Sequence, residues 1–432
     1  MTGRVVVGLV VGIVLLLPVP PVSVAQPAGG GGDMTVDELV DQALRQNAEL
    51  AAARAEVDAA IGRLRQAGLR PNPMLDLAGQ QNVSGPDNNV SVGLVVPLDL
   101  NGRKDGRVGV AGRELAMKRA QVGDRQRRLR ADVRMKAGEV LAAARNVQVT
   151  GELLEVNRTG LRLLQERVRT GAIPPLEGNL MQVEVNRLDA SRQVLESRLE
   201  VLRLQLRALA GFTPESPLAV RGELEGPGVP LDRDVGVTRA LAARPDLEAA
   251  RTDVALAQAR VRKEEADGRW DASVNVGYQR QETGFMLNGI TDRGGTRPIQ
   301  DVFHMVGGGV TITLPVRNRN QGNVQAARAE VRAAERRREF LELQVRQEVA
   351  AAFTQYNVAR RSLALYARGV RDLARQNLDV VRQSHGLGRI PLLDVVAEQR
   401  RYIDIEMGYT DALKQAWDGA VEIERALGVA VR

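Results

Sequence analysis

The stretch Gly-Arg-Ile-Pro-Leu-Leu-Asp at residues 388–394 decides the fold, because a second copy, Gly-Ala-Ile-Pro-Pro-Leu-Glu, stands at residues 171–177. Glycine, isoleucine, proline, leucine and an acidic residue recur at the same relative positions, and roughly 70 residues without proline precede each copy. Glycine just past one helix and proline at the start of the next are helix stop and start signals. Each copy therefore predicts a long helical hairpin, and the pair indicates an internal duplication.

The two long proline-free segments, Arg103–Arg169 and Gln321–Ser384, predict helices of about 65 residues, or about 100 Å each. Glycines interrupt the first segment, so we expect it to be the less regular helix. The return helices, Leu176–Ala210 and Leu392–Leu427, are only about half as long. Each return helix can therefore pack against only half of a long helix. The other half would lack a partner unless another helix continued in line with the return helix.

Two further helical segments have the missing length, Thr35–Gly68 and its repeat Val237–Ala266. Thr35 and Glu38 fit a capping box at the start of the first. Pro245 predicts a break in the second, whereas the first has Ala48 at that point. We expect these helices to stack end to end with the return helices. The repeats then span residues 35–211 and 235–432, joined by a proline-rich linker at 212–234.

Four segments with alternating apolar side chains follow the same order in both halves. Met74–Val83 and Asn89–Leu98 predict one hairpin; residues 273–279 and 306–314 predict another, joined by a looser loop at 282–301. An apolar face opposite a small or polar face suits a strand between lipid and water, although a half-buried soluble sheet looks similar. An open membrane barrel needs more than about eight strands, so several chains must pool theirs, and three would give twelve.

The N-terminus, residues 1–25, has the pattern of a secretory signal peptide. Arg4 precedes the apolar run Val5–Leu17, and Ser23-Val24-Ala25 is a small-x-small cleavage site. The apolar run is shorter than the about 20 residues that cross a membrane. A buried helix is the alternative interpretation. We expect export with cleavage after Ala25, followed by a flexible leader at residues 26–34.

The composition excludes several classes of function. Aromatic residues make up 3% of the 432 residues and hydrophobic residues 44%, which suits narrow helix seams better than a thick globular core. The net charge is +7, but arginines alternate with acids along the expected helices, as on solvated faces, so we expect no nucleic-acid partner. The absence of cysteine excludes disulfides, thiolate metal sites, a cysteine nucleophile and a lipid-anchored N-terminal cysteine.

The two histidines, His304 and His385, lie too far apart in sequence to form an HExxH-like ligand pair. His304 neighbours Met305, but adjacent residues of a strand point to opposite faces. We therefore expect neither a metal site nor a cofactor. Because no nucleophile, base or cofactor constellation stands out, we also do not expect an enzyme.

The chain resembles the TolC family of outer membrane efflux proteins over essentially its whole mature length. The resemblance rests on the duplicated helix-strand-strand-helix-helix order, on Ala-Leu-x-x-Asn-x-x-Leu at residues 43–50 and on Leu-Pro-Val-Arg-Asn-Arg-Asn-Gln-Gly-Asn at residues 314–323. The last stretch is similar to a segment of the branch that serves cobalt-zinc-cadmium cation exporters. Many relatives carry a lipobox cysteine that this chain lacks, so the barrel alone would anchor it.

This resemblance implies a mainly α fold with a membrane β-barrel portion: a homotrimer with a twelve-stranded barrel in outer membrane lipid and a long α-helical coiled-coil barrel in the periplasm. It also implies a passive exit duct in a tripartite efflux system, fed by a periplasmic adaptor and an inner-membrane transporter, with the RND type as the candidate transporter and metal cations or drugs as the cargo. The alternative is an exported coiled-coil scaffold with a small soluble sheet. A scaffold of that kind would not explain why four strands stand at equivalent places in the two halves.

The same resemblance assigns two sites. The hairpin tips would dock the adaptor through Gly171, Ile173, Pro174, Gly388, Ile390 and Pro391. Glu177 and Asp394, each six residues past a tip glycine, would form an acidic ring at the periplasmic aperture. Two simpler interpretations stay open: the glycines end helices by adopting positive φ, and the acids complement helix dipoles in the first turn.

Overall fold

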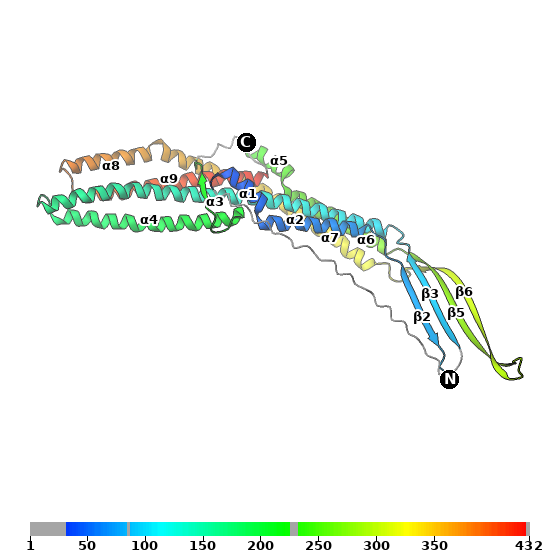
Figure 1. Ribbon diagram of the computed structural model, residues 1–432. Coiled ribbons are helices and arrows are strands. Elements are labelled where there is room, and N and C mark those ends of the chain that lie inside the picture. The colour runs from blue at the N-terminus through cyan, green and yellow to red at the C-terminus, as the bar shows by residue number, and fades with distance from the viewer. Residues whose placement is uncertain (1–31, 84–86, 225–231, 429–432) are drawn as a thin grey trace.

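The computed structural model describes residues 32–83, 87–224 and 232–428. These form an elongated molecule in which the helices make a long bundle and four strands extend from one end (Figure 1). The expected signal peptide, most of the leader and part of the linker lie outside the described residues.

The two halves repeat one order of elements, as predicted. The first half contains β1 (Asp33–Thr35), α1 (Val36–Gln46), α2 (Ala48–Ala67), β2 (Met74–Gln81), β3 (Asn88–Pro97), α3 (Arg103–Arg169) and α4 (Pro175–Ala210). The second contains α5 (Arg233–Ala243), α6 (Pro245–Asp267), β5 (Asp271–Ile290), β6 (Thr296–Thr313), α7 (Gln321–Leu365), a π-helical turn (Tyr366–Val370), α8 (Arg371–Gly386) and α9 (Leu392–Leu427). Between them, β4 (Ala219–Arg221) pairs in parallel with β1, so the last residues of the expected leader form a strand.

Each half begins with a helix broken by an elbow. The predicted capping box at Thr35 is present, since its hydroxyl accepts from the Glu38 amide and its own amide donates to the Glu38 carboxylate at 2.8 Å. The second half breaks at Arg244, and α6 begins at Pro245 as predicted. The first half breaks at the equivalent Asn47, which the sequence analysis missed. The Asn47 side chain caps α2, as asparagine commonly does at helix starts.

The elbows receive the ends of the return helices. Asn47 donates from its side-chain amide to the Leu209 carbonyl in the last turn of α4, at 3.0 Å. The equivalent Arg244 donates to the Ala426 carbonyl in the last turn of α9, at 3.2 Å. The glycine that ends α4, Gly211, has φ 80°, and a Cβ there would lie 2.7 Å from a backbone oxygen of the first elbow. The return helices therefore stop directly against the elbows.

Helix order is consistent along the whole molecule. Far from the strands the helices pack in the order α4, α3, α9, α8; near the strands the order is α2, α3, α6, α7. Thus α2 continues the line of α4, and α6 continues the line of α9, which confirms the predicted end-to-end stacking. Figure 1 shows α8, α9, α3 and α4 as successive layers at the end far from the sheet.

The two long helices differ in the opposite way from the prediction. The first, α3, is continuous from Arg103 to Arg169 despite its glycines. The second is interrupted between α7 and α8, where Gly369 takes φ 149° and ψ −29°, a conformation that favours glycine. Glycine in α3 instead permits close packing: a Cβ at Gly138 would lie 2.6 Å from the Trp417 indole of α9. The prediction from glycine content was therefore wrong: the glycine-rich α3 is regular, and the second long helix is the interrupted one.

The four-stranded sheet is antiparallel in the order β2-β3-β5-β6, with β2 and β6 at its edges. Strands β5 and β6 are longer than predicted and pair out to Ile290 and Thr296 with one irregularity, so most of the expected loop at 282–301 is strand. The prediction failed there because glycine and asparagine in the segment are typical of loops, whereas ladder pairing depends on the backbone. Leu77 is 70% exposed and Val306 79%, so the single chain leaves apolar sheet surface uncovered.

The stretch at residues 314–323 forms the joint between the sheet and α7. Asn320, the N-terminal boundary residue of α7, has φ 60°. Its side-chain amide donates to the backbone carbonyl of Glu264 at 3.0 Å and to its carboxylate at 2.6 Å, near the end of α6. In the first half, Asn101 has φ 61° and donates to the Trp270 carbonyl. Asparagine tolerates the left-handed region better than most residues, so both joints use it at the turn from strand to helix.

No described helix is both long and apolar enough to cross a bilayer.

Buried polar contacts join the two halves near the end of the bundle far from the strands. Asn157 of α3 and Gln399 of α9 exchange side-chain hydrogen bonds of 3.1 and 2.9 Å and are almost fully buried. Glu184 of α4, 1% exposed, pairs with Arg187 at 2.6 Å and with Arg400 of α9 at 2.9 Å. Such pairs fix how the helices align, because a displaced helix would leave a buried polar group without a partner.

We expect Glu184→Gln to lower the stability of the folded protein by about 2 kcal/mol at pH 7, because it removes a buried charged partner. Burial alone raises the pKa of Glu184, but the hydrogen bonds and charges of Arg187 and Arg400 outweigh it and hold that pKa below its ordinary value of 4.5. A depressed carboxyl pKa contributes stability above the unfolded pKa and loses it as pH falls through the folded pKa. Denaturation midpoints of wild type and variant should therefore approach each other as the pH falls below 4.5 and through the folded-state pKa.

The control for this experiment is Glu196→Gln on the same helix. Glu196 pairs with Arg192 at 2.8 Å, but both side chains are more than a third exposed. The control should change stability by less than about 0.5 kcal/mol at either pH. A gap between wild type and Glu184→Gln that stays constant from pH 7 to pH 3.5 would contradict the ionic role.

Candidate functional site: the two hairpin tips

Both hairpins end in the same backbone motif. Gly171 has φ 74° and Gly388 has φ 70°. The amide of the next residue, Ala172 or Arg389, donates to the carbonyl five residues back, at 2.8 and 2.9 Å. Each glycine amide donates to the carbonyl three residues back, at 3.0 and 2.8 Å. This is the Schellman arrangement, which satisfies the last carbonyls of a helix by placing one residue in the left-handed region.

The tip glycines are exposed, and the space around them is open. A Cβ built at Gly171 or Gly388 would meet no atom within 4 Å. Glycine is therefore favoured at these positions by the backbone conformation and not by packing within the chain. An asparagine, which tolerates the left-handed region, would fit either tip of the isolated chain.

The isoleucine and proline of each tip connect the turn to the return helix. Ile173 is half-buried and packs against an apolar cluster inside the bundle. Pro174 and Pro391 both have extended backbones, with φ −65° and −71°, and the return helices begin at the next residue. The cluster beneath the tips joins α3, α4 and α9 through Leu153, Leu154, Leu161, Leu164, Met181, Val185, Leu188, Leu392, Val395, Val396 and Ile403.

The two tips differ in one contact that the sequence analysis did not assign. The imidazole Nδ1 of His385, in the last turn of α8, lies 3.0 Å from the Ile390 carbonyl oxygen beyond the turn. The equivalent position in the first hairpin is Val168, which has no polar side chain. The second tip is therefore braced across its turn. The signal in the sequence was a histidine close to the end of a helix.

The two predicted acids lie in the first turns of the return helices. The Glu177 amide is 3.3 Å from the Pro174 carbonyl oxygen, and the Asp394 amide is 3.2 Å from that of Pro391. Glu177 is half-buried, Asp394 is exposed, and neither carboxylate forms an ion pair within the described part of the chain. Their placement suits a helix-dipole role, and both charges stay available to solvent or to another chain.

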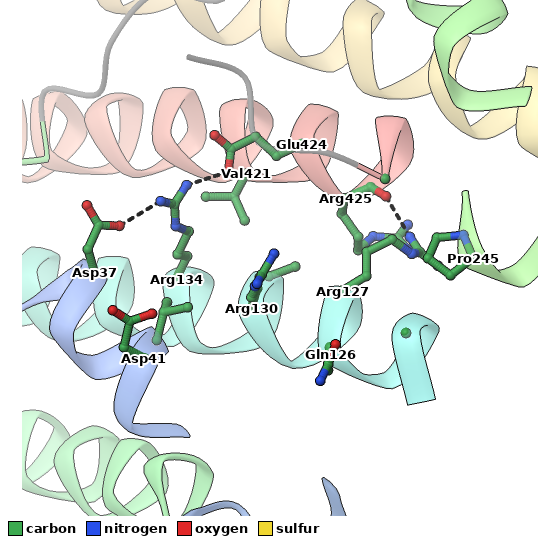
Figure 2. A pocket seen from close by; sticks show the side chains of 14 residues that line it. Asp37, Asp41, Gln126, Arg127, Arg130, Arg134, Pro245, Val421, Glu424 and Arg425 are labelled. Carbon is green, nitrogen blue, oxygen red and sulfur yellow. Dashed lines mark hydrogen bonds and ion pairs between the residues drawn. The ribbon is translucent and has the colours of Figure 1, made fainter. Parts of the chain in front are cut away.

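A second polar region lies at mid-length, where a cavity of about 580 Å³ opens between α1, α3 and α9 (Figure 2). Arg134 bridges Asp37 of α1, at 2.7 Å, and Glu424 of α9. Arg127 pairs with Asp246 of α6 at 3.5 Å. These pairs neutralise charges from four helices, so we interpret the region as a junction of the bundle. Across the described residues, no three His, Cys, Asp or Glu side chains are placed to hold a metal ion.

Asp246 lies between two arginines of this junction, Arg244 and Arg127. Burial alone raises its pKa, but hydrogen bonds from Arg244 and the charges of Arg244 and Arg127 together lower it below the ordinary value. The pKa of Arg244 is raised by Asp246 and Glu348 in spite of burial. Both groups stay charged at neutral pH. The ion pairs thus link the elbow of the second half to α3 and α7.

Comparison with known proteins agrees with this geometry. The model of the outer membrane efflux protein family matches residues 39–211 and 236–429, one match in each half. The cobalt-zinc-cadmium resistance protein CzcC of Cupriavidus metallidurans is 25% identical over 406 residues, which cover 93% of this chain and 92% of that protein.

Solved structures share the fold over nearly the whole chain. CusC superposes with a TM-score of 0.73 at 17% identity and covers 94% of this chain and 96% of its own. The outer membrane protein VceC of Vibrio cholerae superposes with a TM-score of 0.69 at 19% identity and covers 92% and 97%. Because one family model matches both halves and relatives share nearly the full length, the chain belongs to the outer membrane efflux protein family.

Proposed function

We propose that three copies of the chain form the exit duct of a tripartite efflux system, with the sheets pooled into a twelve-stranded barrel in the outer membrane and the helices forming a tunnel in the periplasm. The proposal includes export by the N-terminal signal peptide with cleavage after Ala25. The duct is passive: it conducts substrate without chemistry of its own, and the barrel anchors it without a lipid-modified cysteine.

The observation that carries this proposal is the pair of free edges that the chain presents. On the first edge lie β2, α2 and α4; on the second lie β6, α7 and α8. Each of these elements stands at an end of the helix order or of the strand order described above. The edge strands connect directly to edge helices, since α2 leads into β2 and β6 leads into α7. Edges that differ from each other and run the full length of the molecule suit head-to-tail contacts, which close into a ring.

Exposed apolar residues mark the helical part of both edges. On α4 they include Val183, Val194 and Val201; on α7, on α8 and directly after α8 they include Val358, Leu365, Leu373, Val380 and Leu387. The second set is spaced by seven or eight residues, close to the heptad repeat of a coiled-coil seam. We propose that the first edge of one copy packs against the second edge of the next. A ring of three is favoured because an open channel needs more than about eight strands.

We expect the detergent-purified protein to have the mass of three chains by light scattering. Val194→Glu combined with Val201→Glu should lower the trimer fraction, because it places charges in the apolar seam. Leu163→Glu is the control: Leu163 is exposed on α3, which has helices of its own chain on both sides. A monodisperse monomer with full strand content in the wild type would refute the assembly.

The tips are the part of the duct proposed to meet the periplasmic adaptor, which connects it to an inner-membrane transporter; a transporter of the RND type is the candidate. They lie at the end of the helices farthest from the sheet (Figure 1). The exposed glycines, with open space around them, support a role in contact with another protein, because packing within the chain does not demand so small a residue there.

Gly388→Asn separates docking from helix termination. Asparagine tolerates φ 70° and its Cβ would meet no atom of the chain within 4 Å, so trimer yield should stay close to that of wild type, whereas efflux measured by substrate resistance in cells should be lost. Gly102→Asn is the matched control, since Gly102 has φ 81° and equally open surroundings near the sheet. If yield and efflux fall in parallel for Gly388→Asn, the glycine serves only to end α8.

Glu177 and Asp394 are proposed to line the aperture formed by the six tips of a trimer. Three copies of each would gather six carboxylates, which raise the local cation concentration and oppose closure by mutual repulsion. The cargo proposed is metal cations, because CzcC is named for cobalt, zinc and cadmium resistance; drugs are the alternative cargo.

Glu177→Gln combined with Asp394→Asn should reduce cation preference and block by multivalent cations in single-channel recordings, because the carboxylates attract cations. Glu166→Gln, an exposed acid in the last turn of α3 paired with Arg169, is the control and should leave selectivity unchanged. Unchanged selectivity in the double variant, together with a stability loss of about 0.3–1 kcal/mol per acid, would reduce both acids to helix-dipole partners.

A further inference from the structure

A cavity of about 440 Å³ lies between α3, α8 and α9, beside the π-helical turn that separates α7 from α8. In helix order α9 lies between the other two, so α3 and α8 form the walls. Four arginines line the cavity, Arg145 from α3 and Arg371, Arg375 and Arg382 from α8. Four positive charges this close together repel one another unless each is paired with a negative charge or exposed to water.

Two of the arginines are compensated within the chain. Glu406 of α9, almost fully buried, accepts from Arg371 at 2.8 Å and from Arg145 at 3.5 Å. The same two guanidinium groups lie over the Tyr409 ring at 5.1 and 5.2 Å from its centroid. The Tyr402 hydroxyl also donates to Glu406, at 3.2 Å. These contacts lie at one end of the cavity and pair both guanidinium groups with Glu406, although the Nε atom of Arg145 is buried without a partner.

The other two arginines are not compensated. The Nη2 atom of Arg382 is buried and has no hydrogen-bond partner. Arg375, which is exposed, forms no hydrogen bond or ion pair in the part of the chain that the structure describes. Asp379 lies one helical turn from both on α8, yet it is in no ion pair of the described residues. The remaining acid of the lining, Glu152, accepts from Gln148 on its own helix.

Arg382 as a whole is half-buried, but its buried Nη2 donor is unfavourable without a partner, because it has lost water and gains no hydrogen bond in return. Burial lowers the pKa of Arg382, with only a partial offset from Asp379, but a guanidinium stays charged at neutral pH. A partner from outside the chain would remove this cost. It must be negatively charged, and it must present several oxygen acceptors to two planar, fork-shaped donors.

We propose that the cavity between α3, α8 and α9 binds a small phosphate-type oxyanion, held by the guanidinium groups of Arg375 and Arg382. The cavity has room for more than a single phosphate, so a diphosphate or a phosphorylated small molecule also fits. Arg145 and Arg371 add positive potential while they stay bound to Glu406. The anion would contact the wall formed by α8 immediately after the π-helical turn.

The test is isothermal titration calorimetry on the detergent-purified full-length protein, in a buffer of low ionic strength. Inorganic phosphate should bind once per chain, and pyrophosphate should bind more tightly because it fills more of the cavity. Arg375→Gln combined with Arg382→Gln should weaken phosphate binding at least about tenfold. Arg332→Gln, at an exposed position on α7 outside the cavity, is the control and should leave the affinity unchanged.

A second pair of substitutions guards against a variant that misfolds. Arg375→Lys combined with Arg382→Lys keeps both charges but removes the planar forks, so phosphate affinity should fall between wild type and the glutamine variant. Helical content of each variant is checked by circular dichroism. No binding of phosphate or pyrophosphate up to millimolar concentration overturns the proposal. So does equal binding by wild type and both double variants, or equal affinity for chloride and phosphate.

Discussion

A helix that stops partway along a bundle leaves its last carbonyl groups without partners in the helix, and donors from the next helix in line can both satisfy them and hold the two helices end to end. Both return helices of this protein stop in that way, α4 at Ala210 and α9 at Leu427. The elbow residues Asn47 and Arg244 supply the donors from the start of the next helix in line. The stacks formed there give α3 and α7 a partner along their whole length. The continuous path from tips to sheet depends on these two junctions.

The repeat made most of this architecture predictable. Stop and start signals at the tips are local, so the hairpins, the capping box at Thr35 and the break before Pro245 follow from short stretches of sequence. The elbow at Asn47 was missed because asparagine inside a helical pattern gives a weak signal, and its role depends on the end of α4, far away in sequence. Long-range partners of this kind cannot be inferred from spacing along one helix.

The glycines of the two long helices show the same limit, because their effect on the helix depends on packing and not on the local sequence. In α3, Gly138 makes room for the Trp417 ring and the helix continues; in the second long helix, Gly369 adopts positive φ and the helix is interrupted. Both residues stand in proline-free helical sequence, and only the packed structure distinguishes them. The tip residues were found from the duplicated stretch and their docking role from resemblance to a family, and the structure adds their backbone conformation. The arginine cavity beside α8 had no signature, because it joins residues from three helices.

The interruption at Gly369 also has a consequence for symmetry. Two similar halves per chain would give a ring of three chains six nearly equivalent hairpins, an approximate sixfold arrangement. Only the hairpin of the second half carries the π-helical turn, and only its tip is braced by His385. The ring is thereby reduced to true threefold symmetry, with continuous and interrupted hairpins in alternation. A partner that touches all six tips would meet two classes of contact, three on unbroken helices and three on helices interrupted at a defined point.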